Sequence, residues 1–527
     1  MDARAVRDAL AEATGLSWAV QRREPVRTDP VRSEEVVVTR VDYDAAPDRV
    51  GGRMPILELE PIPTCTERII YVRRCAWAND AFPGTSPLFP KRTVAAGWAR
   101  LHEWAAEAPG VGHWVLDIGV GTFALPVTSE GTTKALESVD LAHLTVRGKG
   151  SDRTTLEGPG GGATWAVIFK ESRDLTVSGF RLTYTGIPPL ESSGIDLQSV
   201  RYARLIDLVL DPISFWGVRC IGLGGGEVPS PGACEDVHVH GCTFVGPMVN
   251  PGNPNPEALL VADTTRVHIA SCHFVGIQEV GVGLWRAVID ADVEGCTFEG
   301  PGHGARVGRT TSDVRFVDCT FTCANGIQAA LDPDHVSNAP YATLVTVDRC
   351  HFTDPQPGTG SGITLYACDG VTIRGSGFVG LNNGVVLGDN ADHPPPRNVR
   401  IETCVFEGPP LSEAWHLRSD ILVQKHGLEP CGHVIAECCF RNAVHTHAAL
   451  TLVSGLTATA DSDPPTLAAQ AWAALGIQLL DDNKMCHTGG DVTWKDSFRA
   501  IEITNADGVG TTFVFEPFAG SSECCPE

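Results

Sequence analysis

The sequence predicts an all-β protein, a solenoid of short parallel strands with an N-terminal cap region and a capping helix. Three observations support this prediction. The 56 glycines and 36 prolines among 527 residues favour many short elements joined by turns over long helices. A short phrase that ends in Cys-x-Phe recurs along the chain, and a further apolar strand follows most copies. Recurrence of this kind is typical of stacked repeats.

The repeated phrase reads apolar, any, apolar, two residues, Cys, any, Phe. Residues two apart in a strand point to the same side. The two apolar residues, the Cys and the Phe therefore all point inward, across a tight corner where glycine or a polar residue stands, as at Gly241. The copies end at Phe244, Phe274, Phe298, Phe321, Phe352, Phe378 (with Ser in place of Cys), Phe406 and, in a shifted form, Phe440, and from Phe244 to Phe406 successive copies lie 23 to 31 residues apart.

A third strand follows the phrase after a loop of variable length. Three short strands in each repeat, stacked coil on coil, indicate a parallel solenoid. A β-sandwich would need regular hairpin turns, which the sequence lacks, and a propeller would need about four strands in a longer repeat. The third strands are expected at residues 193–198, 257–263, 280–286, 304–309, 325–331, 361–366 and 383–389.

The cysteines of the phrase occupy one equivalent inward position in successive coils. We expect them to form a column of small, buried, reduced thiols. Use of the same column for disulfides or for a metal is the alternative. The residues concerned are Cys242, Cys272, Cys296, Cys319, Cys350, Cys404 and Cys438.

The two ends of the chain depart from the repeat. Residues 1–90 are expected to form an N-terminal cap or appended region, and residues 91–510 the solenoid domain. Val94, Trp98, Leu101 and Ala105 fall at helical spacing, which predicts a helical cap over residues 93–108 that covers the open end of the solenoid. Residues 455–490 interrupt the repeat as an insertion, and residues 511–527 form a C-terminal tail.

The charge balance limits the classes of partner. The formal net charge is −24, which argues against nucleic acid, because binding there depends on neutralising phosphates. No uninterrupted apolar run reaches the length of a membrane span, so no membrane partner is expected. The N-terminus lacks the apolar core and cleavage site of a signal peptide. From this we expect a cytoplasmic protein.

Several phrases resemble the right-handed parallel β-helix superfamily typified by pectate lyase and pectin lyase. They are residues 144–158, 174–186 and 370–389, together with an entry strand within residues 113–126. The resemblance covers roughly residues 91–510 and implies a right-handed coil. It also implies that substrates lie along the sheet of third strands and the loops that lead into it. Because this superfamily includes lyases, hydrolases, epimerases, phage tailspikes and non-catalytic modules, activity has to be argued from particular residues.

Outward positions of the third strands supply candidate substrate-binding residues. Coils stack about 4.8 Å apart, so we expect Trp285, Arg306 and Gln328 to be near neighbours. An aromatic ring, an arginine and an amide suit a sugar, through stacking and through hydrogen bonds to hydroxyl or carboxylate groups. The alternative is an ordinary solvated face. The substrate-binding set is Asp196, Arg219, Trp285, Gln328 and Tyr366.

Glu257, Glu279 and His303 stand just before three consecutive third strands, which predicts that they stack at the edge of the groove. Crowded carboxylates shift each other's pKa and supply general acid and base. With Arg306 they form the candidate catalytic set, whereas the alternative is a row of solvated loop residues. The family resemblance adds calcium as a possible cofactor, with Arg306 as base and Glu257, Glu279 and Asp263 as cation ligands. No firm metal site is predicted.

These residues favour a carbohydrate-active enzyme that cleaves a polysaccharide or glycoside on the outer face of the β-helix, by hydrolysis or β-elimination. Two alternatives remain open. One is a non-catalytic β-helix with a binding or structural role. The other is an intracellular cyclase or isomerase that acts on a small molecule. The oligomeric state is not predicted.

Overall fold

The computed structural model describes residues 67–514 apart from a set of internal segments. The N-terminal residues 1–66, most of the expected insertion and the last part of the expected tail lie outside the described residues. The segments left out within 67–514 are residues 108–111, 127–132, 159–163, 185–192, 212–215, 223–231, 247–256, 330–341, 357, 389–394, 409–418, 425–430, 442–447, 454–476, 480–482, 487–497 and 505–509.

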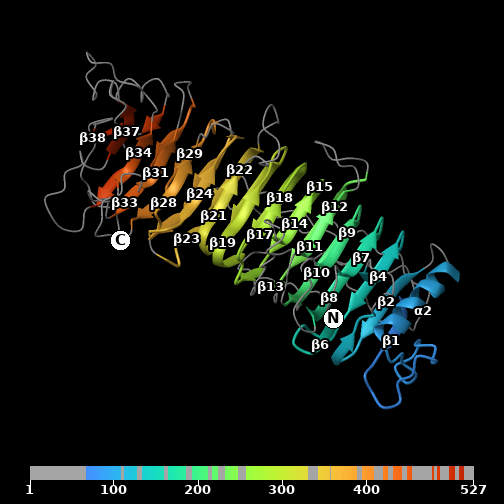
Figure 1. The fold of residues 1–527 in the computed structure, drawn as a ribbon. Coiled ribbons are helices and arrows are strands. Elements are labelled where there is room, and N and C mark those ends of the chain that lie inside the picture. Colours follow the sequence, from blue (N-terminus) through green and yellow to red (C-terminus); the bar gives the residue numbers. More distant parts are fainter. Residues whose placement is uncertain are drawn as a thin grey trace, which may run out of the picture. The chain divides into compact units, whose positions relative to one another are not determined.

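The described chain from Glu67 onward is a right-handed parallel β-helix, as predicted. Strands of one coil pair in parallel with those of the next, and three sheets run along the solenoid (Figure 1). The first sheet contains β1 (Glu67–Val72), β2 (His113–Ile118), β5 (Ala142–Arg147), β8 (Arg173–Tyr184), β10 (Arg201–Leu210), β12 (Cys234–His240), β15 (Thr264–Ala270), β18 (Val288–Glu294), β20 (Ser312–Val317), β22 (Ala342–Asp348), β25 (Cys368–Asp369), β26 (Thr372–Arg374), β29 (Arg400–Glu402), β32 (Val434–Ala436) and β35 (Gln478–Leu479).

The second and third sheets complete each coil. The second contains the later parts of β8 and β10 together with β3 (Gly121–Ala124), β6 (Thr154–Gly158), β13 (Thr243–Val245), β16 (His273–Val275), β19 (Thr297–Val307), β21 (Thr320–Ala329), β23 (His351–Thr353), β27 (Gly377–Val379), β30 (Val405–Glu407), β33 (Cys439–Arg441) and β36 (Lys484–Cys486). The third contains the ends of β19 and β21 together with β4 (Thr133–Val139), β7 (Thr164–Lys170), β9 (Ser193–Gln198), β11 (Trp216–Ile221), β14 (Glu257–Ala262), β17 (Val280–Leu284), β24 (Ser361–Leu365), β28 (Asn383–Leu387), β31 (Ser419–Gln424), β34 (Ala448–Val453) and β37 (Phe498–Thr504).

The phenylalanines of the repeated phrase form one continuous stack inside the solenoid. Successive rings from Phe244 to Phe440 have centroids 4.6 to 5.2 Å apart, and their planes are within 8° of parallel. This spacing matches the distance between neighbouring strands. The side chains are buried. The phrase therefore specifies the register of the coils, because a slip by one residue would turn every ring outward.

A column of glycines in the third sheet makes room for this stack. A Cβ added to Gly304, Gly326, Gly362 or Gly384 would lie 2.4 to 2.7 Å from Cδ1 of a stacked phenylalanine. It would also meet a backbone oxygen of the next coil, as Gly326 would meet the oxygen of Gly362 at 2.4 Å. Each of these glycines is followed by an inward apolar residue, so the pattern Gly-apolar marks the start of a third strand.

Replacing one glycine of this column tests how tightly it packs against the phenylalanine stack. We expect Gly326→Ala to lower the free energy of unfolding by about 1 to 3 kcal/mol, the usual range for an overpacked core. Gly380→Asn is the control, because nothing lies within 4 Å of its added Cβ and its φ of +70° suits asparagine. Urea unfolding of the two variants checks the prediction, and equal midpoints would contradict it.

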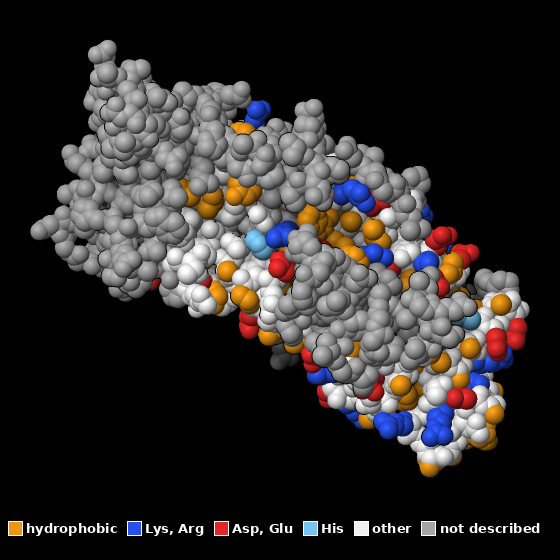
Figure 2. Space-filling model, in the orientation of Figure 1, with side chains coloured by type: hydrophobic (Ala, Val, Ile, Leu, Met, Phe, Trp, Pro, Cys, Tyr) orange, Lys and Arg blue, Asp and Glu red, His pale blue; other side chains and the backbone are white. Residues whose placement is uncertain are grey.

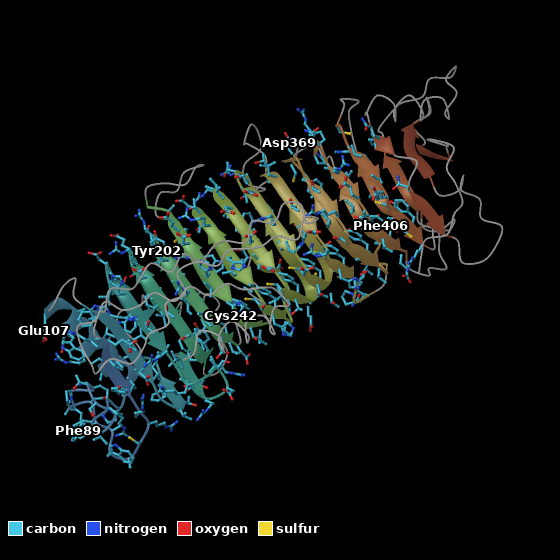
Figure 3. All side chains as sticks on the ribbon, turned by 180° about the vertical axis from the view of Figure 1, so that it is seen from behind. Phe89, Glu107, Tyr202, Cys242, Asp369 and Phe406 are labelled. Carbon is cyan, nitrogen blue, oxygen red and sulfur yellow. The ribbon has the colours of Figure 1, made fainter. Side chains whose placement is uncertain are left out.

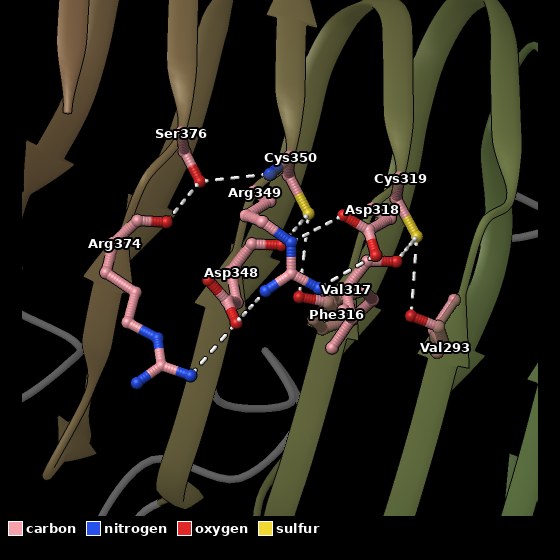
Figure 4. A network of polar contacts seen from close by, with 10 residues as sticks. All are labelled: Val293, Phe316, Val317, Asp318, Cys319, Asp348, Arg349, Cys350, Arg374 and Ser376. Carbon is pink, nitrogen blue, oxygen red and sulfur yellow. Dashed lines mark hydrogen bonds and ion pairs between the residues drawn. The ribbon is translucent and has the colours of Figure 1, made fainter. Parts of the chain in front are cut away.

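The seven cysteines of the phrase are free, buried thiols. The side chain at this corner position also accepts a hydrogen bond from the backbone N–H of the equivalent residue in the preceding coil. Cys272 donates its N–H to Sγ of Cys296 at 3.5 Å, and Cys350 donates to Oγ of Ser376 at 3.1 Å (Figure 4). Ser376 therefore preserves this contact where the column lacks sulfur.

Ion pairs lie on the outer side of the same corner (Figure 4). Arg349 contacts Asp318 at 2.8 Å and Asp348 at 2.7 Å, and Arg374 contacts Asp348 at 2.9 Å. Arg349 is about half exposed, so each contact contributes little by itself. Together they link three consecutive coils.

The N-terminal end of the solenoid is covered by helix α2 (Val94–Glu107), close to the predicted range 93–108. Val94, Trp98 and Leu101 are buried, and Nε1 of Trp98 donates to the backbone oxygen of Glu137 at 3.0 Å. Strand β1 pairs in parallel with β2, so residues 67–72 belong to the first sheet although the sequence places the domain boundary at residue 91. No helix in the described residues has the length and apolar character needed to cross a membrane.

The C-terminal end of the described residues has a different strand pairing. Strand β38 (Gly510–Val514) pairs with β37 in the antiparallel direction, unlike the pairings along the solenoid. Residues 510–514, which include the start of the expected tail, therefore add a strand to the third sheet.

Candidate functional site

The candidate site lies on the outer face of the third sheet, around β11, β14, β17, β19 and β21. The register defines two outward columns across these strands. One runs through Trp216, Glu257, Val280, His303 and Asn325. The other runs through Asp196, Arg219, Leu260, Gly283, Arg306, Gln328 and Thr364.

Glu257 is the most unusual residue of this face. It is only 2% exposed, and its carboxyl lies beside the Cβ position of Gly283 in the next coil. Its carboxylate accepts a hydrogen bond from Nε1 of Trp285, and Trp216 precedes it in the same column. Burial raises the pKa of Glu257 to about 8, against smaller opposite effects of the Trp285 hydrogen bond and the Arg306 charge. This buried carboxyl is therefore protonated at neutral pH.

Gly283 makes this enclosure possible. A Cβ at Gly283 would lie 2.7 Å from Nε1 of Trp285 and 2.8 Å from Oε1 of Glu257. The structure places Gly283, and not Trp285, beside Arg306. Trp285 follows the end of β17, and its indole nitrogen lies over Gly283, the register partner of Arg306.

His303, Arg306 and Gln328 come from β19 and β21. Arg306 donates from Nε to Oε1 of Gln328 at 3.1 Å, as neighbours in adjacent coils. Burial, with the Arg306 charge, lowers the pKa of His303 to about 4. Among the described residues, the buried Nδ1 of His303 has no hydrogen-bond partner. The imidazole is therefore neutral at neutral pH and has an uncommitted nitrogen.

Glu279 does not occupy the position that the sequence predicts. Val280, not Glu279, aligns with Glu257 and His303. The loop before β17 shifts the alignment by one residue, and Glu279 is partly exposed. Burial lowers the pKa of Arg306, and the charges of Glu257 and Glu279 raise it by a smaller amount. The charge of Glu279 therefore still acts on the site.

Asp196, Arg219 and Trp216 form a second group next to Glu257. Arg219 binds the fully buried Asp196 through two hydrogen bonds of 2.8 and 2.7 Å. Its guanidinium also lies 4.9 Å from the centre of the Trp216 ring. The predicted residues Asp196 and Arg219 therefore act together, and they hold Trp216 beside Glu257.

Trp216 was missed by the sequence reasoning. The signal that identifies it is the Gly217 that follows, because the residue before each glycine of the column lies in the same column as Glu257. Tyr366 lies farther along the face, after β24. Its ring carbon Cε1 would be 2.3 Å from a Cβ at Gly388, so the ring lies over the next coil.

The expected calcium ligands are not brought together. Among the described residues, no group of three or more His, Cys, Asp or Glu side chains is arranged to hold a metal ion. Asp263 is buried at the turn after β14, with Oδ2 2.3 Å from a Cβ added to Gly222. Glu257 stands at the opposite end of that strand.

The raised pKa of Glu257 predicts a pH-dependent stability. The folded protein keeps a proton that the unfolded chain releases, since the pKa rises from 4.5 to about 8 on folding. The stabilising contribution is complete below pH 4.5 and is lost as the pH rises through 8, by at most about 5 kcal/mol. We expect Glu257→Gln to flatten this slope in urea unfolding across that range. Glu279→Gln, the control, should leave the slope in place, and an unchanged slope in Glu257→Gln would contradict the prediction.

Comparison with known proteins adds a likeness of fold. No protein-family model and no curated protein sequence matches this chain. A mutant tailspike protein of E. coli bacteriophage HK620 in complex with a pentasaccharide is 11% identical, with a TM-score of 0.48 over 80% of this chain and 76% of that chain. Another mutant of that tailspike, in complex with a hexasaccharide, is 10% identical with a TM-score of 0.47 over the same shares. The pre-mature gene product 12 of bacteriophage phi29 is 9% identical, with a TM-score of 0.42 over 69% of this chain and 52% of that chain.

Proposed function

We propose that this chain is a carbohydrate-active enzyme that cleaves a glycan lying along the outer face of the third sheet. The observation that carries the proposal is Glu257, a buried carboxyl that accepts a hydrogen bond from Trp285 and whose pKa is raised to about 8 by burial. A carboxylic acid that stays protonated at neutral pH is suited to general acid catalysis.

In the proposed reaction, Glu257 gives its proton to the glycosidic oxygen as the bond to that oxygen breaks. In hydrolysis the bond to the anomeric carbon breaks, and water adds to that carbon. In β-elimination the bond to C4 of a uronate breaks, and a base removes the proton from C5. His303 is suited to accept a proton in either reaction, because its ring is neutral and its Nδ1 has no hydrogen-bond partner in the part of the chain that the structure describes.

The surroundings of Glu257 suit a sugar chain. Uncharged polar residues continue along the two outward columns, with Asn325 and Gln328 on β21 and Ser361 and Thr364 on β24. Amides and hydroxyls can bind sugar hydroxyls, and indole rings offer flat apolar faces to sugar rings. On the side shown in Figure 2, described hydrophobic side chains lie close to basic and acidic ones.

Product analysis tests the proposal. The protein would be incubated with neutral glycans and polyuronates, with and without calcium, and the panel would include oligosaccharides of five and six sugars. New reducing ends without an unsaturated product would indicate hydrolysis, and ultraviolet absorbance of an unsaturated uronate would indicate β-elimination. Saturable binding without either product, equal in the wild type and Glu257→Gln, would contradict the enzymatic proposal and favour a binding module.

A further inference from the structure

A cluster of three cations surrounds one buried carboxylate at the N-terminal end of the solenoid. Asp117 of β2 is 2% exposed. Nη2 of Arg73, which follows β1, lies 2.6 Å from Oδ1 of Asp117. Nε of Arg147, at the end of β5, and Nζ of Lys149, in the turn after it, each lie 2.9 Å from Oδ2. The cluster belongs to the first sheet, whereas Glu257 belongs to the third.

The cluster has a surplus of positive charge. Burial raises the pKa of Asp117, but the hydrogen bonds from Lys149, Arg147 and Arg73 outweigh it and hold that pKa below its ordinary value. The carboxylate therefore stays charged, and three cations against one anion leave a local charge of +2. This contrasts with the net charge of −24 on the whole chain, which disfavours indiscriminate binding of anions. Figure 2 shows Lys and Arg side chains at the end of the solenoid that carries β1, β2 and β6.

Arg147 and Lys149 keep hydrogen-bond donors that the cluster does not use. Arg147 uses only Nε toward Asp117, so its two terminal NH₂ groups remain, and Lys149 uses one of its three N–H bonds among the described residues. Their side chains are 36% and 37% exposed. Asp117 holds both side chains in place, which reduces the side-chain conformational entropy that would be lost when a ligand binds.

We propose that Arg147 and Lys149 form a binding site for a doubly charged tetrahedral oxyanion, either free sulfate or the phosphate group of a ligand. The charge of the cluster equals and opposes that of such a group. The flat guanidinium can bind two of its oxygens, and the ammonium can bind a third as a point charge. The site is independent of the proposed glycan cleavage, because it shares no residue, strand or sheet with Glu257.

Calorimetric titration with inorganic phosphate, and separately with sulfate, tests this site at constant ionic strength set with chloride. We expect saturable binding of one anion per chain. Lys149→Gln and Arg147→Gln should each weaken it by about tenfold or more, the effect of losing a charge-assisted hydrogen bond. Arg147→Lys keeps the charge but loses the flat fork, so it should fall between the wild type and Arg147→Gln. The two titrations distinguish a phosphate ligand from a sulfate ligand.

Arg266→Gln is the matched control. Arg266 is 48% exposed and pairs with both Asp236 and Glu235, so the same change is made where the surrounding charge is negative. It should bind phosphate and sulfate as the wild type does, and thermal unfolding without either anion would verify that each variant is folded. The proposal is overturned if neither anion binds saturably, or if Arg266→Gln loses as much affinity as Lys149→Gln.

Discussion

Phe321→Ala is expected to lower the free energy of unfolding by about 3 to 5 kcal/mol, the range observed for removing a buried phenylalanine. The ring of Phe321 is 1% exposed and lies between those of Phe298, at 4.6 Å, and Phe352, at 4.8 Å. It also makes an edge contact with Phe316 at 6.4 Å. Its removal leaves a cavity that the backbone cannot close, because the strand ladders fix the distance between the coils.

Phe89→Ala is the matched control for this substitution. Phe89 is 53% exposed at the end of the chain that carries the helix (Figure 3), so we expect less than about 1 kcal/mol from its removal. Circular dichroism during urea unfolding gives both values. A solenoid also allows partial unfolding from its ends, so hydrogen exchange of β19, β21 and β23 would show whether the loss is local. Equal loss of stability in the two variants would refute the role assigned to the stack.

The repeated phrase allowed the interior to be predicted from sequence. An inward residue of constant type in every coil can be recognised without knowing the loop lengths, because the phrase itself contains both strands and the corner. The stack from Phe244 to Phe440 lies where the phrase predicts it, and the cysteines of the phrase are buried. The N-terminal helix was predictable for a similar reason, since apolar spacing over one turn after another is a local signal.

The outer face was harder to predict because its register depends on loops. Residues two apart on a strand point to the same side, so periodicity alone cannot decide whether Gly283 or Trp285 stands beside Arg306. A loop that is longer or shorter by one residue has a larger effect, and it explains why Val280 replaces Glu279 in the column of Glu257. The glycines that pack against the phenylalanine stack would have resolved both cases, because each fixes the start of its third strand.

The burial of Glu257 could not be derived from any single coil. The carboxyl comes from β14, the indole that donates to it follows β17, and the charge that acts on it comes from Arg306 of β19. Its raised pKa is therefore a property of three stacked coils. A free carboxylate on a solvated loop, which was the alternative from the sequence, would keep an ordinary pKa.

Glu257→Gln is expected to reduce the rate of glycan cleavage by about 10²- to 10⁴-fold, the usual contribution of a general acid. The reason is that glutamine keeps the size and neutral charge of the protonated side chain but has no acidic proton to give. Binding of the glycan should therefore persist in this variant, which separates loss of chemistry from loss of the site. The rate is measured on the glycan that the wild type cleaves, and binding by titration with the same glycan.

The pH profile gives an independent test of the same role. The acid is active only while protonated, so the wild-type rate should hold up to about pH 8 and fall at higher pH as Glu257, with its pKa of about 8, loses its proton. The residual rate of Glu257→Gln should lack this decline. Glu279→Gln is the control, because Glu279 lies one residue from the column of Glu257 and is partly exposed; it should keep most of the rate and the same decline. A wild-type rate that stays constant above pH 8 would contradict this role, and Glu257 would then not be the acid.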